Sequence, residues 1–109
     1  MVTRFYIAGK VSGENYADVV RKFDEAEKQI YESINYGDFQ LGRVVVFNPI
    51  SICDQSWCWL YCMLVCLQYV LVSQVIVLLP DWRESRGARI EERFARLLGK
   101  TIWEINSNQ

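Results

Sequence analysis

Residues 74–80 read QVIVLLP. After Gln74, residues 75–79 form an apolar and largely β-branched run, which ends at Pro80. Such a run is typical of a strand buried on both faces of a parallel sheet, because apolar and polar residues stop alternating when neither face meets water. Upstream, residues 57–72 place apolar side chains at helical spacing. The sequence therefore predicts a helix over 57–72 that leads into a core strand over 74–79.

The segment between Asp54 and Asp81 contains no charged residue. Its length is comparable to the roughly 20 apolar residues that cross a bilayer. Polar amide and hydroxyl side chains interrupt it, however, and both of its flanks are acidic rather than rich in Lys and Arg. A signal peptide is not expected either, because the apolar stretch near the N-terminus covers only residues 5–8. We therefore expect no membrane partner.

The composition indicates one folded domain over residues 1–109. Apolar residues make up 51 % of the chain and aromatic residues 14 %, which is enough to build a core. Because 12 Lys and Arg face 13 Asp and Glu, a general electrostatic attraction to nucleic acid is not expected. Histidine is absent, which excludes histidine-based catalytic triads and removes the commonest zinc ligand.

The four cysteines are Cys53, Cys58, Cys62 and Cys66. The last three recur at every fourth position on one side of the predicted helix, which fits either a metal-binding face or a column of small, partly buried side chains. The Cys-x-x-Cys spacing of structural zinc sites is missing. We expect reduced thiols and a cytoplasmic location, with no metal and no cofactor bound.

The rest of the chain alternates between strand and helix patterns. We predict strands over residues 4–8, 43–47 and 101–105, a turn over 37–42, and helices over 16–34, with Asn15 as N-cap, and over 87–98, with Gly99 as the stop. Strands that alternate with helices favour a parallel sheet covered on both faces. The predicted fold is a three-layer α/β/α, flavodoxin-like fold with a four-stranded parallel sheet in the order 2-1-3-4.

Right-handed crossovers place the carboxyl ends of all strands at one edge of such a sheet, where ligands bind in open α/β proteins. Three segments are expected to meet there, namely residues 8–13, 48–51 and 81–91. The first of them contains two glycines, Lys10 and Ser12. It indicates either a close approach of the backbone to a ligand or an ordinary strand-to-helix turn.

The third segment leaves the core strand and enters a helix whose predicted N-cap is Ser85. The free amides of a first helical turn form an anion site. Arg86 and Arg89 lie at this positive helix end, where a cation is disfavoured by roughly a few tenths of a kcal/mol unless an anion binds. The alternative is a solvated arginine stripe. Glu91, one turn further on, is either a surface charge or a carboxylate directed at the sugar of a nucleotide.

Four segments closely resemble a family of small bacterial and phage proteins of unassigned function. They are residues 6–13 (YIAGKVSG), 47–49 (FNP), 78–82 (LLPDW) and 85–91 (SRGARIE). That family looks like a minimal version of the fold of nucleoside 2-deoxyribosyltransferases and deoxynucleoside-monophosphate N-glycosidases. The resemblance covers nearly the whole chain and implies a protein that binds a nucleoside or nucleotide.

The resemblance also implies roles for individual residues. Glu91 matches the glutamate that attacks the anomeric carbon of deoxyribose in the enzymes. Ser85 and the amides around Gly87 match the groups that hold a hydroxyl or a 5′-phosphate. The catalytic residue expected is therefore Glu91, and the ligand-binding residues expected are Tyr6, Gly9, Lys10, Ser12, Asn48, Asp81, Trp82, Ser85, Arg86, Gly87 and Arg89.

Two positions depart from the family's pattern. Gln74 stands where relatives carry an acidic residue that helps to protonate the leaving base in the enzymes, and Leu64 stands where many relatives have an arginine. Loss of a general acid costs about 10²–10⁴ in rate, and the substitutes Asp81 and Glu84 do not match the family position. Three functions stay open: cleavage or transfer at the N-glycosidic bond of a (deoxy)nucleoside 5′-phosphate, binding of a nucleotide signal without catalysis, or an assembly or interaction role in which the pocket is vestigial.

Relatives of this fold form dimers or larger rings. The sequence agrees, because Trp57, Trp59 and Tyr61 give the helix over 57–72 more apolar faces than one sheet can cover. We therefore expect a homodimer or a higher homo-oligomer.

Overall fold

The computed structural model describes residues 2–11, 15–36, 43–53 and 56–105. In this part of the chain the strands are β1 Val2–Ala8, β2 Arg43–Phe47, β3 Val75–Leu78 and β4 Thr101–Glu104. The helices are α1 Tyr16–Tyr36, α2 Pro49–Ile52, α3 Trp59–Val72 and α4 Arg86–Leu97, with the 3-10 helix η1 Trp82–Glu84. The turn predicted over 37–42 lies outside the described residues.

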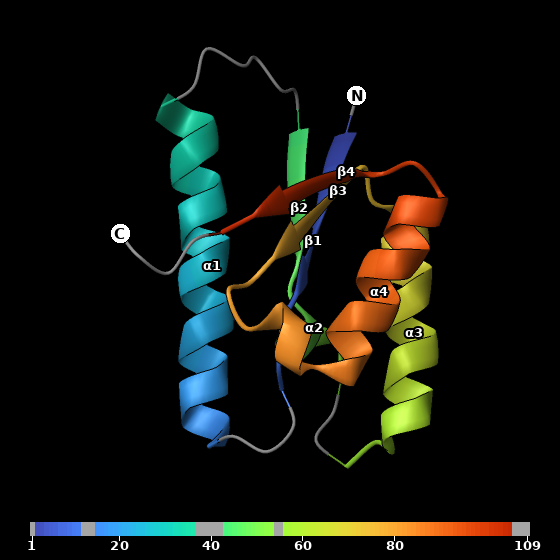
Figure 1. Cartoon of the computed structure of the whole chain (residues 1–109). Coiled ribbons are helices and arrows are strands. Elements are labelled where there is room, and N and C mark those ends of the chain that lie inside the picture. The colour runs from blue at the N-terminus through green and yellow to red at the C-terminus, as the bar shows by residue number, and fades with distance from the viewer. Residues whose placement is uncertain (1, 12–14, 37–42, 54–55, 106–109) are drawn as a thin grey trace.

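The described strands are parallel and lie in the order β2-β1-β3-β4. β1 is the partner of both β2 and β3, since Tyr6 pairs with Phe47 on one side and with Ile76 on the other. The predicted parallel sheet, its order and its two helical layers are confirmed. The carboxyl ends of β1, β2 and β3 reach the lower edge of the sheet in Figure 1, where α2 follows β2 and η1 follows β3.

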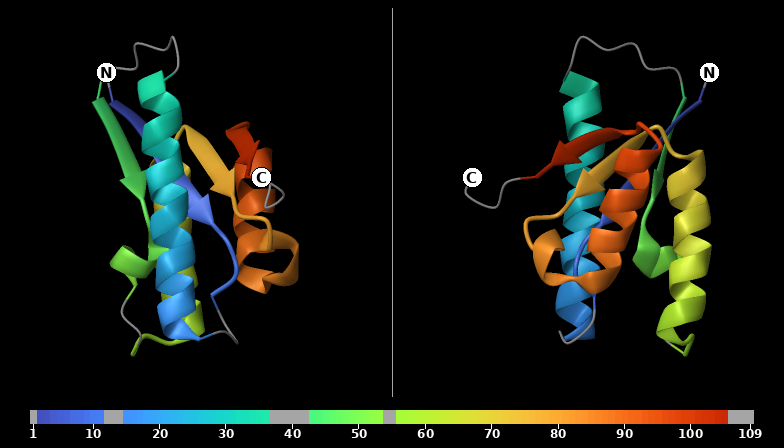
Figure 2. Two further views of the ribbon diagram at one scale, coloured as in Figure 1. Left: turned by 90° about the vertical axis from the view of Figure 1, so that its left-hand side faces the viewer. Right: turned by 45° about the vertical axis from the view of Figure 1, so that its right-hand side comes forward.

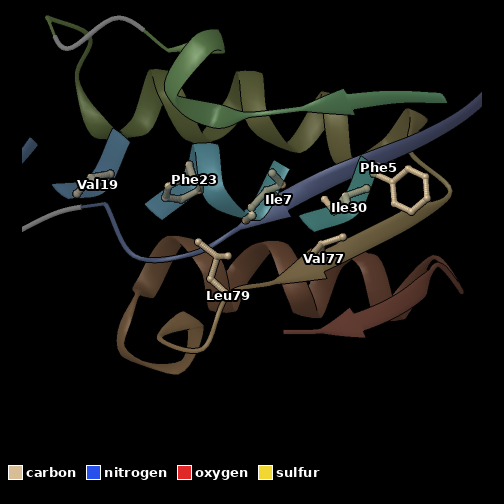
Figure 3. Close-up of a cluster of buried hydrophobic side chains, with 8 residues drawn as sticks. Phe5, Ile7, Val19, Phe23, Ile30, Val77 and Leu79 are labelled. Atoms are coloured by element: carbon tan, nitrogen blue, oxygen red, sulfur yellow. The ribbon is translucent and has the colours of Figure 1, made fainter. Parts of the chain in front are cut away.

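Helices cover both faces of the sheet, with α1 on one face and α3 and α4 on the other (Figures 1 and 2). Alternate residues of β1 supply both cores. The core under α1, shown in Figure 3, consists of Phe5, Ile7, Val19, Phe23, Ala26, Ile30, Val77 and Leu79. The core under α3 and α4 consists of Tyr6, Ala8, Cys66, Val70, Ile76, Leu78, Ala88 and Ala95. A strand buried on both faces explains why residues 75–79 show no polar alternation.

Two predicted helix caps are present. Asn15 Oδ1 accepts a hydrogen bond from the Ala17 N–H at 2.9 Å, and Ser85 Oγ accepts one from the Ala88 N–H at 3.1 Å. After α4, Gly99 has a φ of +74°, a conformation that favours glycine. These local contacts fix the start of α1 and both ends of α4 to within one residue of the prediction.

The segment between β2 and α3 differs from the prediction. α3 begins at Trp59 instead of residue 57, because Cys58 has an extended backbone with φ −70° and ψ 157°. The unpredicted α2 forms because Pro49 suits a first helical position and Asn48 Oδ1 accepts from the Ile50 N–H at 3.0 Å. Among the described residues, no helix has both the length and the apolar character needed to cross a membrane.

Gly9 follows β1 and lies against the buried side chain of Leu79. A Cβ at position 9 would be 2.5 Å from Leu79 Cδ1, and Leu79 is only 2 % exposed, so its side chain has little room to move. We expect Gly9→Ala to lower the free energy of unfolding by about 1–3 kcal/mol, measured by urea titration. In a Leu79→Ala background the same change should cost much less, and an equal cost in both backgrounds would contradict this contact.

Candidate functional site

A cavity of about 420 Å³ opens at the carboxyl edge of the sheet, between the end of β1, α2, α3 and the start of α4. This volume is in the range of small-molecule sites. Its wall is mostly apolar and aromatic. The lining residues are Tyr6, Gly9, Val11, Tyr16, Pro49, Ile50, Cys53, Trp57, Trp59, Cys62, Met63, Cys66, Ser85, Gly87, Ala88 and Glu91.

Glu91 supplies the one carboxyl among the described residues that line the cavity. It projects from the second turn of α4 and is 5 % exposed. The Tyr6 hydroxyl, in the central strand, donates a hydrogen bond to Glu91 Oε2 at 2.6 Å. Glu91 Oε1 has no hydrogen-bond partner among the described residues. Every fully buried polar side-chain atom of these residues does have such a partner. Oε1 is therefore not fully buried, in a residue that lines the cavity.

The environment of this pair shifts both pKa values upward. Burial raises the pKa of Glu91 to about 8, although the hydrogen bond from Tyr6 opposes the shift by stabilising the carboxylate. Burial and the neighbouring Glu91 charge raise the pKa of Tyr6 well above 10, so its hydroxyl remains a donor. At neutral pH the Glu91 carboxyl is therefore held mainly in its protonated form. A carboxyl that titrates near neutral pH inside a cavity is a candidate for catalysis.

The N-terminus of α4 forms the polar end of the cavity. Ser85 Oγ caps the first turn, and the N–H groups of Arg86 and Gly87 belong to that turn and have no partner within the helix. The Arg86 guanidinium stacks on the Trp59 ring, with Cζ 4.3 Å from the ring centroid. Backbone donors and a positive charge are thus available to an anion at this end.

Comparison with known proteins places the chain in a family. Residues 3–104 match a domain of unknown function, DUF4406. The chain belongs to this family. Neither the curated proteins nor the solved structures contain a match. The matched range includes every residue that lines the cavity, so the cavity lies wholly within the DUF4406 domain.

The DUF4406 domain brings part of the predicted site together. Among the residues expected to act on or bind a ligand, those that line the cavity are Tyr6, Gly9, Ser85, Gly87 and Glu91. Arg86 lies beside them, stacked on a lining tryptophan. These residues come from the end of β1 and the start of α4, which are the segments that parallel topology predicts to converge.

Lys10 and Asp81, two of the expected ligand-binding residues, do not line the cavity and connect neighbouring loops to α1. Asp81 accepts a hydrogen bond from the Lys10 N–H at 3.1 Å and pairs with Lys22 Nζ at 2.5 Å. Lys22 Nζ also donates to the Lys10 carbonyl at 2.7 Å, and the Lys10 ammonium lies 4.0 Å from the Glu84 carboxylate. Asp81 and Glu84 therefore engage lysines outside the cavity lining, and neither takes the place of an acid beside Glu91.

The other predicted ligand-binding residues also lie apart from the cavity lining. The Asn48 amide donates to two carboxylates of α1 at 3.2 and 3.3 Å. The Trp82 indole N–H donates to a carboxylate of β4 at 2.9 Å, and Trp82 and Arg89 line a separate hollow formed by η1 and α4. Ser12 lies outside the described residues.

Gln74, at the position where relatives carry an acid, is exposed at the amino end of β3. Its Oε1 accepts a hydrogen bond from the Arg4 N–H at 2.6 Å. The cavity lies at the opposite, carboxyl end of the strands. The residue at position 74 is therefore not placed to exchange a proton with a ligand beside Glu91 of the same chain.

Sequence reasoning missed the α2 and α3 side of the cavity. Trp57, Trp59 and Met63 line it, and the Tyr61 ring meets Trp57 edge-on at 4.8 Å between centroids. The tryptophans were assigned to subunit contact because α3 is apolar on several faces. Their position in the chain was the usable signal, since they follow β2 at the carboxyl edge of the sheet.

Three of the four cysteines form a cluster in the cavity wall. Cys53 and Cys62 are joined by a disulfide, so the prediction that all thiols are reduced is wrong for this pair. Cys66 Sγ lies 3.6 Å from Cys53 Sγ and 3.9 Å from Cys62 Sγ, while Cys58 is exposed. The three sulfurs lie within 4.8 Å of one another, a spacing that suits a metal ion. Metal binding needs thiolates, however, and the disulfide leaves only Cys66 to supply one.

The raised pKa of Glu91 makes the stability of the fold depend on pH. The carboxyl ionises near its ordinary pKa of 4.5 when unfolded and near pH 8 when folded, so between these values the folded state binds more protons and stability falls as pH rises. Glu91→Gln keeps an acceptor for Tyr6 and removes the charge. In urea titrations from about pH 5 to about pH 9, we expect it to gain about 2–4 kcal/mol over wild type at the alkaline end.

Near pH 5 the two proteins should differ little, because both carry a neutral side chain at position 91. Glu92→Gln is the control, since Glu92 on the same helix pairs with Arg96 at 2.6 Å and does not line the cavity. If wild type and Glu91→Gln lose stability in parallel as the pH rises, Glu91 is not a buried group that titrates near neutral pH.

Proposed function

We propose that this cavity binds a (deoxy)nucleoside 5′-phosphate and that Glu91 cleaves its N-glycosidic bond, by hydrolysis or by deoxyribosyl transfer. The observation that carries the proposal is a single buried carboxyl, oriented by Tyr6, inside an aromatic cavity next to a helix N-terminus. The resemblance of residues 85–91 to the corresponding segment of N-glycoside-cleaving enzymes agrees with it.

The two ends of the cavity suit the two ends of a nucleotide. Trp57 and Tyr16 offer rings against which a base can stack, whereas Trp59, which carries the Arg86 guanidinium, lies at the end next to α4. The free amides of the first turn of α4 and the charge of Arg86 suit a phosphate. With the base at one end and the phosphate at the other, the sugar lies over Glu91.

In the proposed reaction the Tyr6 hydroxyl holds Glu91 Oε2 and leaves Oε1 as the nucleophile. Oε1 bonds to C1′ while the C1′–N bond breaks and its electron pair leaves with the base. The base takes a proton from water, because no second carboxyl among the described residues lines the cavity. Water or the N–H of a second base then attacks C1′ and releases the Glu91 carboxylate, and the proton that the attacking group loses neutralises the hydroxide left when the first base was protonated.

Attack by Glu91 requires its ionised form, so kcat/KM should rise with pH and level off above about 8. The assay incubates the protein with each common deoxynucleoside monophosphate and detects free base by chromatography. Glu91→Gln should release none. Tyr6→Phe removes the donor that stabilises the carboxylate, so its midpoint should move to higher pH. A rate that falls as pH rises through 8 would mean that Glu91 acts as an acid and not as the nucleophile.

Binding of a nucleotide without turnover is the second candidate function. It is favoured by the single carboxyl, since cleavage by the two-carboxylate mechanism uses a separate acid. A nucleotide that raises the melting temperature of wild type and of Glu91→Gln, and that is recovered unchanged, would support this function. Absence of both a thermal shift and base release for every nucleotide would rule out both functions.

We also propose that the chain forms a homodimer through α3. Large apolar side chains lie exposed along one side of this helix, with Leu60 61 %, Leu64 54 % and Leu71 50 % exposed. Light scattering should give about twice the chain mass of 12.8 kDa. Leu64→Lys should shift the mass toward that of one chain, whereas a wild-type protein of 12.8 kDa would contradict the dimer.

A further inference from the structure

The disulfide connects the two helices that form one wall of the cavity. Cys53 is the C-cap residue of α2, and Cys62 lies in α3, 9 positions later. Between them the chain carries Trp57 and Trp59, whose side chains line the cavity. A bond between the two sulfurs therefore closes a short loop around the aromatic wall.

Both sulfurs lie where a small molecule can reach them. Cys53 and Cys62 are half-buried and line the same cavity as Glu91. A low-molecular-weight thiol or disulfide that enters the cavity meets this pair without unfolding of the domain. Cys58, in the same loop, is exposed and forms no disulfide, so it provides a control for non-specific oxidation.

Burial makes Cys66, the third cysteine of the cluster, a poor participant in thiol–disulfide exchange. Cys66 is 3 % exposed, and burial raises its pKa to about 11. At neutral pH it is a thiol, whereas attack on a disulfide requires a thiolate. Although its Sγ is 3.6 Å from Cys53 Sγ, Cys66 is therefore a poor competitor for the bond between Cys53 and Cys62.

We propose that Cys53 and Cys62 form a reversible redox switch that sets the position of the Trp57 and Trp59 wall and so the shape of the cavity. The oxidant is a low-molecular-weight disulfide of the glutathione type. One cysteine thiolate attacks it and releases one small thiol, and the other cysteine then displaces the second small thiol from the mixed disulfide. Two electrons pass to the small disulfide, and the two cysteine protons end on the two small thiols. Reduction reverses these steps.

The disulfide acts on the wall by limiting the conformations of the loop that it closes. This matters here because α3 has no side-chain hydrogen bond at its N-cap, Cys58. A helix start that lacks such a bond opens more readily. In the reduced protein, Trp57 and Trp59 lose the covalent tie to α2 and depend on packing alone.

The test uses the full chain in buffers rich in either oxidised or reduced glutathione. After alkylation, mass spectrometry should find two free thiols in the oxidised protein and four in the reduced one. Hydrogen–deuterium exchange of the peptide that contains Trp57 and Trp59 should become roughly tenfold faster on reduction. Neither measurement uses a nucleotide, so the outcome is independent of the proposed N-glycosidase function.

Cysteine variants identify the pair. Cys58→Ser and Cys66→Ser should keep both the disulfide and the exchange response, whereas Cys62→Ser should lose both. If Cys62→Ser does not fold, Cys53→Ser makes the same test. Four free thiols in oxidising buffer, a bond that maps to Cys66, or unchanged exchange would overturn the switch. Equimolar Zn²⁺ binding that requires Cys62 in the reduced protein would overturn it in favour of a metal site.

Discussion

The hydrogen bond from Tyr6 to Glu91 connects the centre of the sheet to α4, and the rest of the candidate site is arranged around it. Tyr6 lies in β1, which is paired with β2 on one side and β3 on the other, so its ring is fixed by the sheet. Its side chain is fully buried. Its hydroxyl therefore needs an acceptor within the protein, and Glu91 Oε2 is that acceptor. In turn, Tyr6 holds Glu91 where burial disfavours the charge.

Two cations of the described residues form ion pairs with carboxylates other than Glu91. Lys22 pairs with Asp81, and Arg96 pairs with Glu92. Among the described residues, no lysine or arginine lines the cavity. No cation therefore lowers the pKa of Glu91, and burial raises it to about 8. An anionic ligand at the N-terminus of α4 adds a like charge, so the ionisation of Glu91 depends on what the cavity holds.

The sheet could be predicted from the sequence because its causes are local. The run at residues 75–79 is apolar throughout because both of its faces are buried, and the cap at Ser85 is a contact between residues close in the chain. The end of the sheet that carries Gln74 was also predictable, since a residue before a parallel strand lies at the amino edge. Because the cavity lies at the carboxyl edge, this topology also separates Gln74 from the cavity.

The contacts of the cavity wall could not be predicted in the same way. Met63 is buried and lines the cavity whereas Leu64 is exposed, although both are apolar residues of one helix. Lys10 and Asp81 are polar loop residues that either bind a ligand or bind each other. Their connection depends on the Lys22 ammonium, which donates to the backbone carbonyl of Lys10, 12 positions away, and to the Asp81 carboxylate, 59 positions away. Tertiary packing determines which of these side chains line the cavity and which contact one another, and the periodicity of the sequence does not report on it.

The start of α3 combines a place in the cavity lining, surface exposure and a nearby disulfide. Trp59 is the first residue of α3, lines the cavity, carries the stacked Arg86 guanidinium and is still 39 % exposed. A helix start without a side-chain cap bond takes its order from its neighbours. Here the neighbours are Arg86 on one side and, through Cys62, the disulfide to α2 on the other. Because each contact holds the same short segment, a change in one alters the cavity that the others share.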